Sequence, residues 1–296
     1  MLKSNGPLLL AVNHPNSFLD AIILVTQFDK PVYSLTRGDA FNGWLLTKIL
    51  NGFKMLPVYR ASEGVENLDG NYKTFEGCTE IFRQNGIVLI FTEGRCENEW
   101  HLRPLKKGTA RLAIAAWEQN IPLKILPVGM NYNSFSLFGK NVQINMGNPI
   151  EFKNIDASFN DSGRLLNEVT GAIQQQLQTL VYELDKKDLQ LRAAKFNVSV
   201  STFKKLLLII PAILGVLSHW IFYLPVKNFV AKKTLNTGHY DSVIVGLMIL
   251  FYPFYLLLWS LIIYSFYGGY WGWLVFILFP FFAWSYVQIK RQADKL

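Results

Sequence analysis

The sequence predicts an α/β domain with a mostly parallel central sheet flanked by helices, followed by a C-terminal helical membrane region. Two observations predict it. Short apolar runs alternate with helical patterns over residues 1–150, and long apolar runs begin after residue 202, where acidic residues almost vanish. Alternating strands and helices are typical of a parallel sheet covered by helices. We therefore expect one domain over residues 1–198 and a membrane-associated region over residues 199–296.

Strands are expected where short apolar runs are bounded by turn-forming residues. These runs are residues 8–12, 32–36, 53–58, 87–91, 124–128 and 142–146. Helices are expected to begin near Ser17, Phe41, Asn71 and Lys107, where apolar side chains recur at spacings near three and four. The same spacing predicts a longer helix after Asp161.

Three apolar segments follow, over residues 206–224, 243–266 and 270–287. About 20 apolar residues span a bilayer. The last two segments are separated by a short uncharged turn and have basic residues at their far ends, which predicts a transmembrane hairpin whose tip faces away from the cytoplasm. The first segment has lysines at both ends and contains Pro211 and Gly215, so we expect it to be re-entrant, with a plain spanning helix as the alternative.

Basic charge is concentrated beside these apolar segments. Residues 199–296 contain eight basic and two acidic residues, which gives +6 of the formal net charge of +8. Because this charge brackets apolar runs and is not spread along a polar face, an anionic membrane is the expected partner and nucleic acid is not.

Other kinds of chemistry lack their usual motifs. The two cysteines, Cys78 and Cys96, have neither metal-ligand nor disulfide-framework spacing, which fits a reducing cytoplasmic setting. The sequence has no Gly-x-Ser-x-Gly, His-Glu-x-x-His, P-loop or Gly-x-Gly-x-x-Gly pattern. We therefore expect no serine hydrolase, zinc peptidase, nucleotide hydrolase or dinucleotide enzyme, and no metal or other cofactor.

The stretch NHPNSFLDAI places His14 directly after the first predicted strand and Asp20 six residues later. A neutral imidazole, with an unperturbed pKa of ~6.5, suits removal of a proton from an alcohol near neutral pH. A carboxylate bonded to the other ring nitrogen fixes the tautomer. Pro15 and Asn16 interrupt regular structure, so a turn can bring His14 and Asp20 together. The alternative is a helix capped by Asn16 or Ser17, with Asp20 in its first turn and His14 an ordinary strand-end residue.

His14 and Glu93 both follow predicted strands directly. In a parallel sheet the carboxyl ends of the strands meet at one edge, and ligands bind there. We therefore expect both residues to face one crevice.

Four short motifs occur in order over residues 8–149. They are NHPNSFLD, ending at Asp20; GFKMLPVYR, ending at Arg60; FTEGR; and ILPVG. In this order and spacing they resemble the four-block pattern of the glycerol-phosphate and lysophosphatidate acyltransferase superfamily. Two departures stand out. Five residues separate His14 from Asp20, where four are commonest, and Thr92 stands where proline is usual.

The resemblance implies a glycerolipid-acyltransferase-like fold, with His14 as the general base toward a glycerol hydroxyl and Asp20 orienting it. It implies that Arg60 holds the acceptor's phosphate, for which a guanidinium fork is well suited. The substrate-binding residues that it implies are Asn13, Arg60, Glu93, Gly94, Arg95, Lys106 and Lys107. The two lysines open a predicted helix, where they could meet a phosphate or the donor's anionic groups. For Arg60 and Lys107 the alternative is solvated surface charge.

The implied activity is transfer of a fatty acyl group from acyl-CoA or acyl-ACP to a glycerol-3-phosphate or 1-acylglycerol-3-phosphate type acceptor, in phospholipid biosynthesis. The catalytic domain is expected on the cytoplasmic face of the cell inner membrane. Two alternatives stay open at this point. One is an O-acyltransferase for another lipid hydroxyl, such as that of an aminoacyl lipid, and the other is a non-catalytic lipid-binding membrane protein with this fold.

Overall fold

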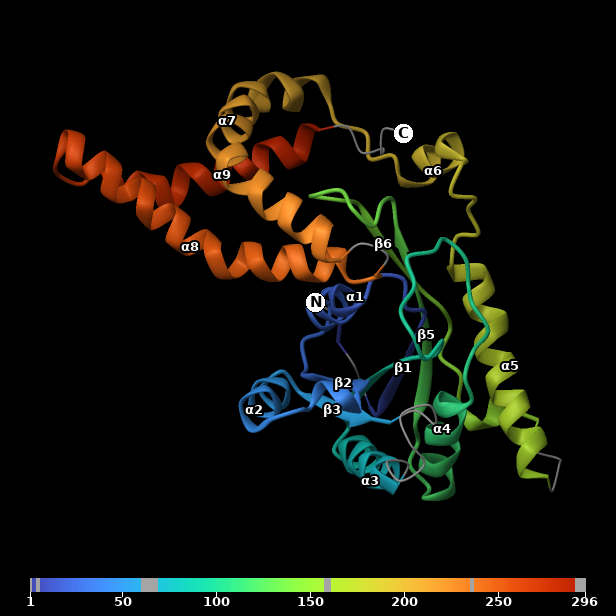
Figure 1. Cartoon of the computed structure of the whole chain (residues 1–296). Helices are drawn as coiled ribbons and strands as arrows, with labels where there is room; N and C mark the ends of the chain where they lie inside the picture. Colours follow the sequence, from blue (N-terminus) through green and yellow to red (C-terminus); the bar gives the residue numbers. More distant parts are fainter. Residues whose placement is uncertain (1, 4–5, 60–68, 157–160, 235–236, 291–296) are drawn as a thin grey trace. The chain divides into compact units, whose positions relative to one another are not determined.

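The computed structural model describes residues 2–3, 6–59, 69–156, 161–234 and 237–290. These residues contain a six-stranded sheet with the strand order β3-β2-β4-β1-β5-β6 (Figure 1). The strands are β1 (Leu8–Val12), β2 (Val32–Arg37), β3 (Met55–Val58), β4 (Ile87–Phe91), β5 (Lys124–Tyr132) and β6 (Val142–Met146). β1 lies in the middle of this order, so both of its edges are paired.

The sheet is mostly parallel. β1 pairs in parallel with β4 and β5, and β2 pairs in parallel with β3 and β4. After β6 the chain runs antiparallel to β5, because the Gly147 N–H donates to the Pro127 carbonyl at 2.9 Å and Ile150 forms an antiparallel bridge with Ile125. The predicted fold class, a mostly parallel sheet flanked by helices, is therefore confirmed.

Helices connect and flank the strands. They are α1 (Phe18–Val25), α2 (Trp44–Gly52), α3 (Asp69–Arg83), α4 (Gly108–Glu118) and α5 (Ser162–Leu180). Each begins within three residues of its predicted start. Asp161 caps α5, since its side chain accepts the Gly163 N–H at 2.8 Å.

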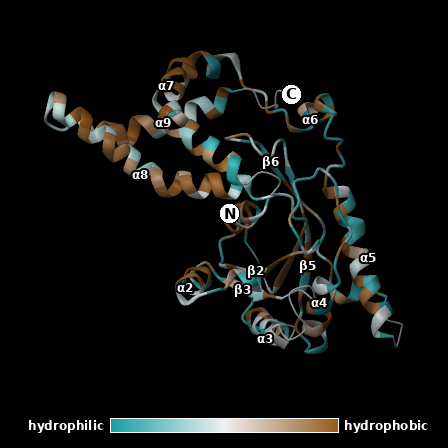
Figure 2. Cartoon of the chain, in the orientation of Figure 1, coloured by the Kyte–Doolittle hydropathy of each residue, from teal (hydrophilic) through white to brown (hydrophobic). Residues whose placement is uncertain are grey.

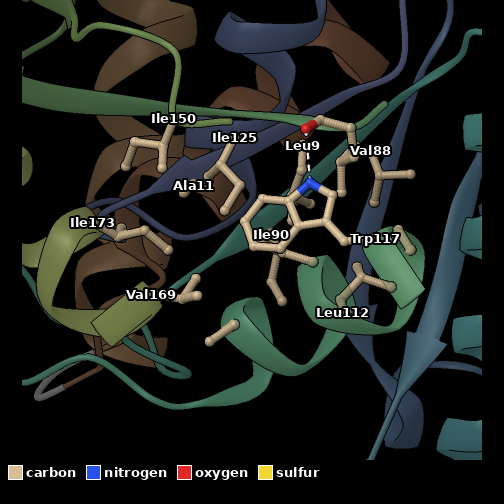
Figure 3. Close-up of a cluster of buried hydrophobic side chains, with 14 of the residues drawn as sticks. Leu9, Ala11, Val88, Ile90, Leu112, Trp117, Ile125, Ile150, Val169 and Ile173 are labelled. Carbon is tan, nitrogen blue, oxygen red and sulfur yellow. Dashed lines mark hydrogen bonds between the residues drawn. The ribbon is translucent and has the colours of Figure 1, made fainter. Parts of the chain in front are cut away.

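The main hydrophobic core lies between the sheet and helices α3, α4 and α5 (Figure 3). Trp117 of α4 lies among strand side chains such as Leu9 and Val88, and its indole N–H donates to the Leu123 carbonyl at 2.9 Å. The alternate strand residues, such as Leu10, point to the opposite face and are fully buried as well. Burial on both faces holds β1 and β4 rigidly, and these two strands carry the candidate site at their carboxyl ends.

The chain divides into two compact units, each described by itself. The sheet unit comprises Met1–Asn131 and Gln143–Asp185, and the helical unit comprises Tyr132–Val142 and Lys186–Leu296. The β5–β6 connection thus belongs to the helical unit. There Lys140 forms a buried ion pair with Asp241.

The helical unit contains α6 (Leu189–Phe196), α7 (Thr202–Lys233), α8 (Tyr240–Tyr267), a 3-10 turn (Trp271–Leu274) and α9 (Val275–Ile289). Three of its segments, α7, α8 and Trp271–Ile289, are long and apolar enough to cross a membrane. Only 17% of the most apolar window of each is buried, and hydrophobic residues run along all three (Figure 2). α7 continues as one helix through Pro211 and Pro225. Its path across or along a membrane stays a prediction.

Candidate active site

Hydrogen bonds of Asn13 fix the position of the chain directly after β1. The side-chain amide of Asn13 donates to the Met130 carbonyl at 3.1 Å and its oxygen accepts the Met130 N–H at 2.7 Å. Asn13 is buried. These two bonds tie the end of β1 to β5, so the structure gives Asn13 a role in holding the loop that carries His14.

The next turn brings the predicted pair together. His14 Nδ1 lies 2.9 Å from Asp20 Oδ2, and the same carboxylate oxygen accepts the Asn16 N–H at 2.8 Å. Ser17, at the N-cap position of α1, has a φ of 54° and makes no side-chain capping bond. This left-handed residue reverses the chain sharply, so Asp20, in the first turn of α1, faces back toward the histidine. Ser17 thus takes the N-cap position and Asp20 the first turn, as the alternative expects, but the Ser17 side chain makes no capping bond and His14 contacts Asp20.

The His14 ring is held on its face as well as at its edge. It stacks on Phe91, the last residue of β4, with ring centroids 3.8 Å apart and planes 11° apart. Asp20 is fully buried, whereas 17% of the His14 side chain is exposed. A carboxylate acceptor at this distance favours the tautomer with its proton on Nδ1 and its lone pair on Nε2. The geometry thus holds the ring of His14 in one orientation and leaves part of its side chain exposed.

Glu93 holds the backbone of this loop. Its Oε2 accepts the His14 N–H at 2.8 Å, and its Oε1 accepts the Arg103 N–H at 2.9 Å. The Arg103 guanidinium also donates to Oε2 at 2.8 Å, and both side chains are buried. The Glu93 carboxylate therefore accepts hydrogen bonds from two backbone N–H groups and from one guanidinium.

Arg103 contributes to the site although the sequence motifs do not assign it a role. A buried carboxylate needs a positive partner or several donors, and that requirement is the one sequence signal that could have identified a basic residue in the following loop. The Arg103 guanidinium also donates to the Arg95 carbonyl, so it ties together both ends of the turn after β4.

The other predicted binding residues of this loop have distinct settings. Gly94 has a φ of 73°, and a Cβ there would lie 3.0 Å from the Lys106 side chain. Lys106 is exposed, and its N–H donates to the Thr92 carbonyl at 2.7 Å. Lys107 is exposed at the N-cap of α4. The Arg95 side chain is 66% exposed and forms an ion pair with Glu97 at 2.7 Å.

Cys96 lies beside the pair, and its surroundings disfavour the thiolate form. Its Sγ accepts the Ser17 N–H at 2.8 Å. Burial, reinforced by the negative charge of Asp20, raises the pKa of the Cys96 thiol to about 12. The thiol therefore stays protonated at neutral pH, and acyl transfer through a cysteine thioester is disfavoured.

Arg60 lies outside the described residues. Tyr59, which precedes it, has its backbone N–H and carbonyl both bonded to the Asn71 side chain at 2.8 Å.

Over the described ranges, no group of three or more His, Cys, Asp or Glu side chains could hold a metal ion. The structure thus brings together His14, Asp20 and Glu93.

Comparison with known proteins bears on this site. Residues 1–131 match the family model described as Acyltransferase. A 74-residue segment is 34% identical to Glycerol-3-phosphate O-acyltransferase 1 of Saccharomyces cerevisiae, covering 24% of this chain and 10% of that protein. The chain therefore matches about a tenth of the length of this curated relative. The crystal structure of the 1-acyl-sn-glycerophosphate (LPA) acyltransferase PlsC from Thermotoga maritima is similar with a TM-score of 0.41 and 14% identity, over 62% of this chain and 70% of that chain.

The family-model match covers the region that carries the site. Residues 1–131 match this model, which agrees with the superfamily that the four sequence motifs resemble.

Proposed function

We propose that the protein is a membrane-bound O-acyltransferase of phospholipid biosynthesis. It moves a fatty acyl group from acyl-CoA or acyl-ACP to a hydroxyl of glycerol-3-phosphate or 1-acylglycerol-3-phosphate. The observation that carries the proposal is the 2.9 Å contact between His14 and the buried Asp20, at the sheet edge of a region that matches the Acyltransferase family model.

His14 acts as the general base in this proposal. Its Nε2 takes the proton of the acceptor hydroxyl while that oxygen attacks the thioester carbonyl carbon. The tetrahedral intermediate then collapses, the carbon–sulfur bond breaks, and the imidazolium returns the proton to the departing thiolate. General base catalysis of this kind contributes ~10²–10⁴-fold to the rate.

The neighbouring groups act through His14. Asp20 stabilises the imidazolium that forms during the reaction and keeps Nε2 free to accept the proton. Glu93 holds the backbone of His14, Arg103 holds Glu93, and Asn13 holds the end of β1. We regard Asn13, Glu93, Gly94 and Arg103 as positioning residues.

Anion recognition is assigned to the basic residues around the same loop. Lys106 and Lys107 lie exposed at the start of α4, where helix amides and lysine charges both favour a phosphate. Arg95 is a further exposed cation beside them. The assignment of the acceptor phosphate to Arg60 rests on the sequence resemblance alone.

The membrane part of the proposal rests on α7, α8 and α9. Their apolar surfaces suit lipid, and the basic residues at their ends favour a cytoplasmic face. A hydrocarbon chain kept in the bilayer avoids water at a gain of ~0.8 kcal/mol per methylene. We propose that the catalytic domain lies on the cytoplasmic face of the inner membrane and receives lipid laterally.

The test is thiol release from acyl-CoA and acyl-ACP by the full-length protein in vesicles, with a panel of acceptors. His14→Ala should lower kcat ~10²–10⁴-fold. His101→Ala is the matched control, because His101 also contacts a carboxylate, Glu99, but is 50% exposed. It should turn over like the wild type.

Three results would contradict the proposal in different ways. Full activity of His14→Ala would remove the assigned base. Turnover only with phosphate-free lipid hydroxyls would favour the other acceptor class. Saturable lipid binding without any thiol release would favour a non-catalytic binding protein.

A further inference from the structure

Helix α2 starts at the sheet edge that carries the candidate active site. It follows β2, which is parallel to β4, and β4 is parallel to β1. The carboxyl ends of these three strands therefore meet at one edge, where β1 leads to His14 and β4 leads to Glu93. From the end of β2 the chain passes through a short 3-10 turn (Gly38–Ala40) into α2.

α2 exposes the hydrophobic side chains that a helix on a sheet normally buries. None of its residues is buried. The exposed fractions are Trp44 78%, Leu45 56%, Leu46 44%, Ile49 45% and Phe53 64%. At about 100° per residue the last four lie on one side of the helix, and we call these four residues the α2 face. Leu45, Ile49 and Phe53 recur every four residues, so they form one stripe along the helix. In Figure 2, α2 is predominantly hydrophobic.

α4 shows the contrast within the same unit. It carries a similar share of apolar residues, but Leu112, Ala113, Ala116 and Trp117 are all buried in the core. The exposure of α2 is therefore a property of this helix and not of the sheet unit in general. Contiguous exposed apolar surface of this kind marks an interaction site.

The charges around the α2 face indicate which kind of partner surface it binds. Between residues 41 and 59 the charged residues are Lys48 and Lys54, both exposed, with no Asp or Glu. Anionic lipid headgroups attract lysines close to a bilayer surface. Tryptophan and phenylalanine beside lysines on a short helix are typical of segments that lie in the membrane interface.

We infer that the α2 face inserts into the interfacial layer of an anionic bilayer. The same chain contains three segments apolar enough to cross a membrane, so a bilayer is a surface that the chain meets. The sheet edge that carries His14 then lies at the lipid surface, because α2 begins at that edge. This inference rests on the membrane association proposed above and not on the acyl-transfer chemistry.

The test places a fluorescent probe on α2 in the full-length protein. Ile49→Cys carries the probe on the α2 face, and Asn51→Cys is the matched control. Asn51 is also exposed, but it lies two residues on and therefore roughly 200° around the helix. Burial raises the pKa of Cys78 and of Cys96 to about 12, so the native thiols label slowly and the wild-type protein serves as the blank.

The measurement uses vesicles of phosphatidylcholine and phosphatidylglycerol, with flotation to confirm that the protein is bound. The Ile49 probe should shift its emission to the blue, lose most of its quenching by aqueous iodide and gain quenching by nitroxide-labelled lipid. The Asn51 probe should stay open to iodide. The nitroxide quenching at Ile49 should weaken in vesicles of phosphatidylcholine alone, where Lys48 and Lys54 lose their anionic partners.

Each contrary outcome is distinct. Equal iodide quenching of the two probes in bound protein would overturn the inference and leave membrane association intact. Protection from iodide without nitroxide quenching would overturn it in favour of a protein covering α2. Failure to float would overturn both the inference and the proposed membrane association, while thiol release in detergent would still report on the chemistry. If Ile49→Cys melts below the wild type, Leu45→Cys on the same stripe replaces it.

Discussion

Two loops of the sheet unit each hold a histidine against a carboxylate, but in very different surroundings. In the loop after β1, His14 Nδ1 lies 2.9 Å from Asp20, and their side chains are 17% and 0% exposed. In the loop after β4, His101 Nε2 lies 3.0 Å from Glu99, and their side chains are 50% and 40% exposed. The two distances are nearly equal. Distance alone therefore does not distinguish the buried pair from the surface contact.

Immobilisation distinguishes them. The His14 ring stacks on Phe91, and the backbone N–H of His14 donates to Glu93. The carboxylate of Asp20 also accepts a hydrogen bond from the Asn16 N–H. An exposed pair such as His101–Glu99 is screened by water and contributes little. The two pairs therefore differ in the groups that fix the histidine ring. The predictions below change the pair itself, the buried ion pair behind it and the turn after β4.

The largest expected effect is that of Asp20→Asn on turnover. The asparagine amide can donate to Nδ1, which favours the tautomer whose Nε2 carries a proton and cannot accept one. We expect kcat to fall ~10²–10⁴-fold, the full contribution of a general base. Glu99→Gln, the same exchange in the exposed pair, should leave kcat unchanged in the thiol-release assay. Equal effects of the two substitutions would refute the distinction between the pairs.

Arg103→Met tests the buried support behind His14. It leaves the Glu93 carboxylate buried without its cation, which costs about 3–5 kcal/mol of unfolding free energy. We expect a marked fall in the apparent Tm of the detergent-solubilised protein. Arg83→Met removes an exposed ion pair with Glu80 and should leave the Tm nearly unchanged. If both substitutions shift the Tm alike, the ion pair with Glu93 is not a specific support of the site.

Gly94→Ala tests the turn after β4 and should have a smaller effect. The φ of 73° is unfavourable for alanine, which costs about 1–2 kcal/mol. Gly77→Ala is the control, because Gly77 lies exposed inside α3 with open space at its Cβ position. Alanine there should stabilise the protein by roughly 0.5–1 kcal/mol, since glycine is a poor helix former. Melting curves of the two variants should thus shift in opposite directions, and a shift in the same direction would contradict the strain assigned to Gly94.

Much of the fold was predictable because it depends on local hydrophobic patterning. The starts of the helices and the positions of β1, β4 and β6 follow from apolar runs and their spacing. The His14–Asp20 contact was predictable as well, because a strand, a turn and a helix start follow one another within a few residues.

Other features depend on contacts between distant residues. β5 extends to Tyr132, beyond the predicted end at residue 128, although Asn131 looks like a strand terminator. Its side chain donates to the Leu180 carbonyl at 2.9 Å and accepts the Tyr182 N–H at 2.7 Å, which keeps this polar residue in a buried strand. The partnership of Glu93 with Arg103 likewise depends on the path of the loop between them. The exposure of α2 could not be predicted from the sequence, because the spacing of its apolar residues is the same as that of a helix packed on a core.

The central claim is that His14 and Asp20 act as one catalytic unit, and a double-mutant cycle on kcat tests it most directly. Residues that act together give non-additive losses. We therefore predict that His14→Ala combined with Asp20→Asn loses no more activity than His14→Ala alone. If instead the two losses multiply, Asp20 contributes independently of His14 and the account of an oriented base is wrong.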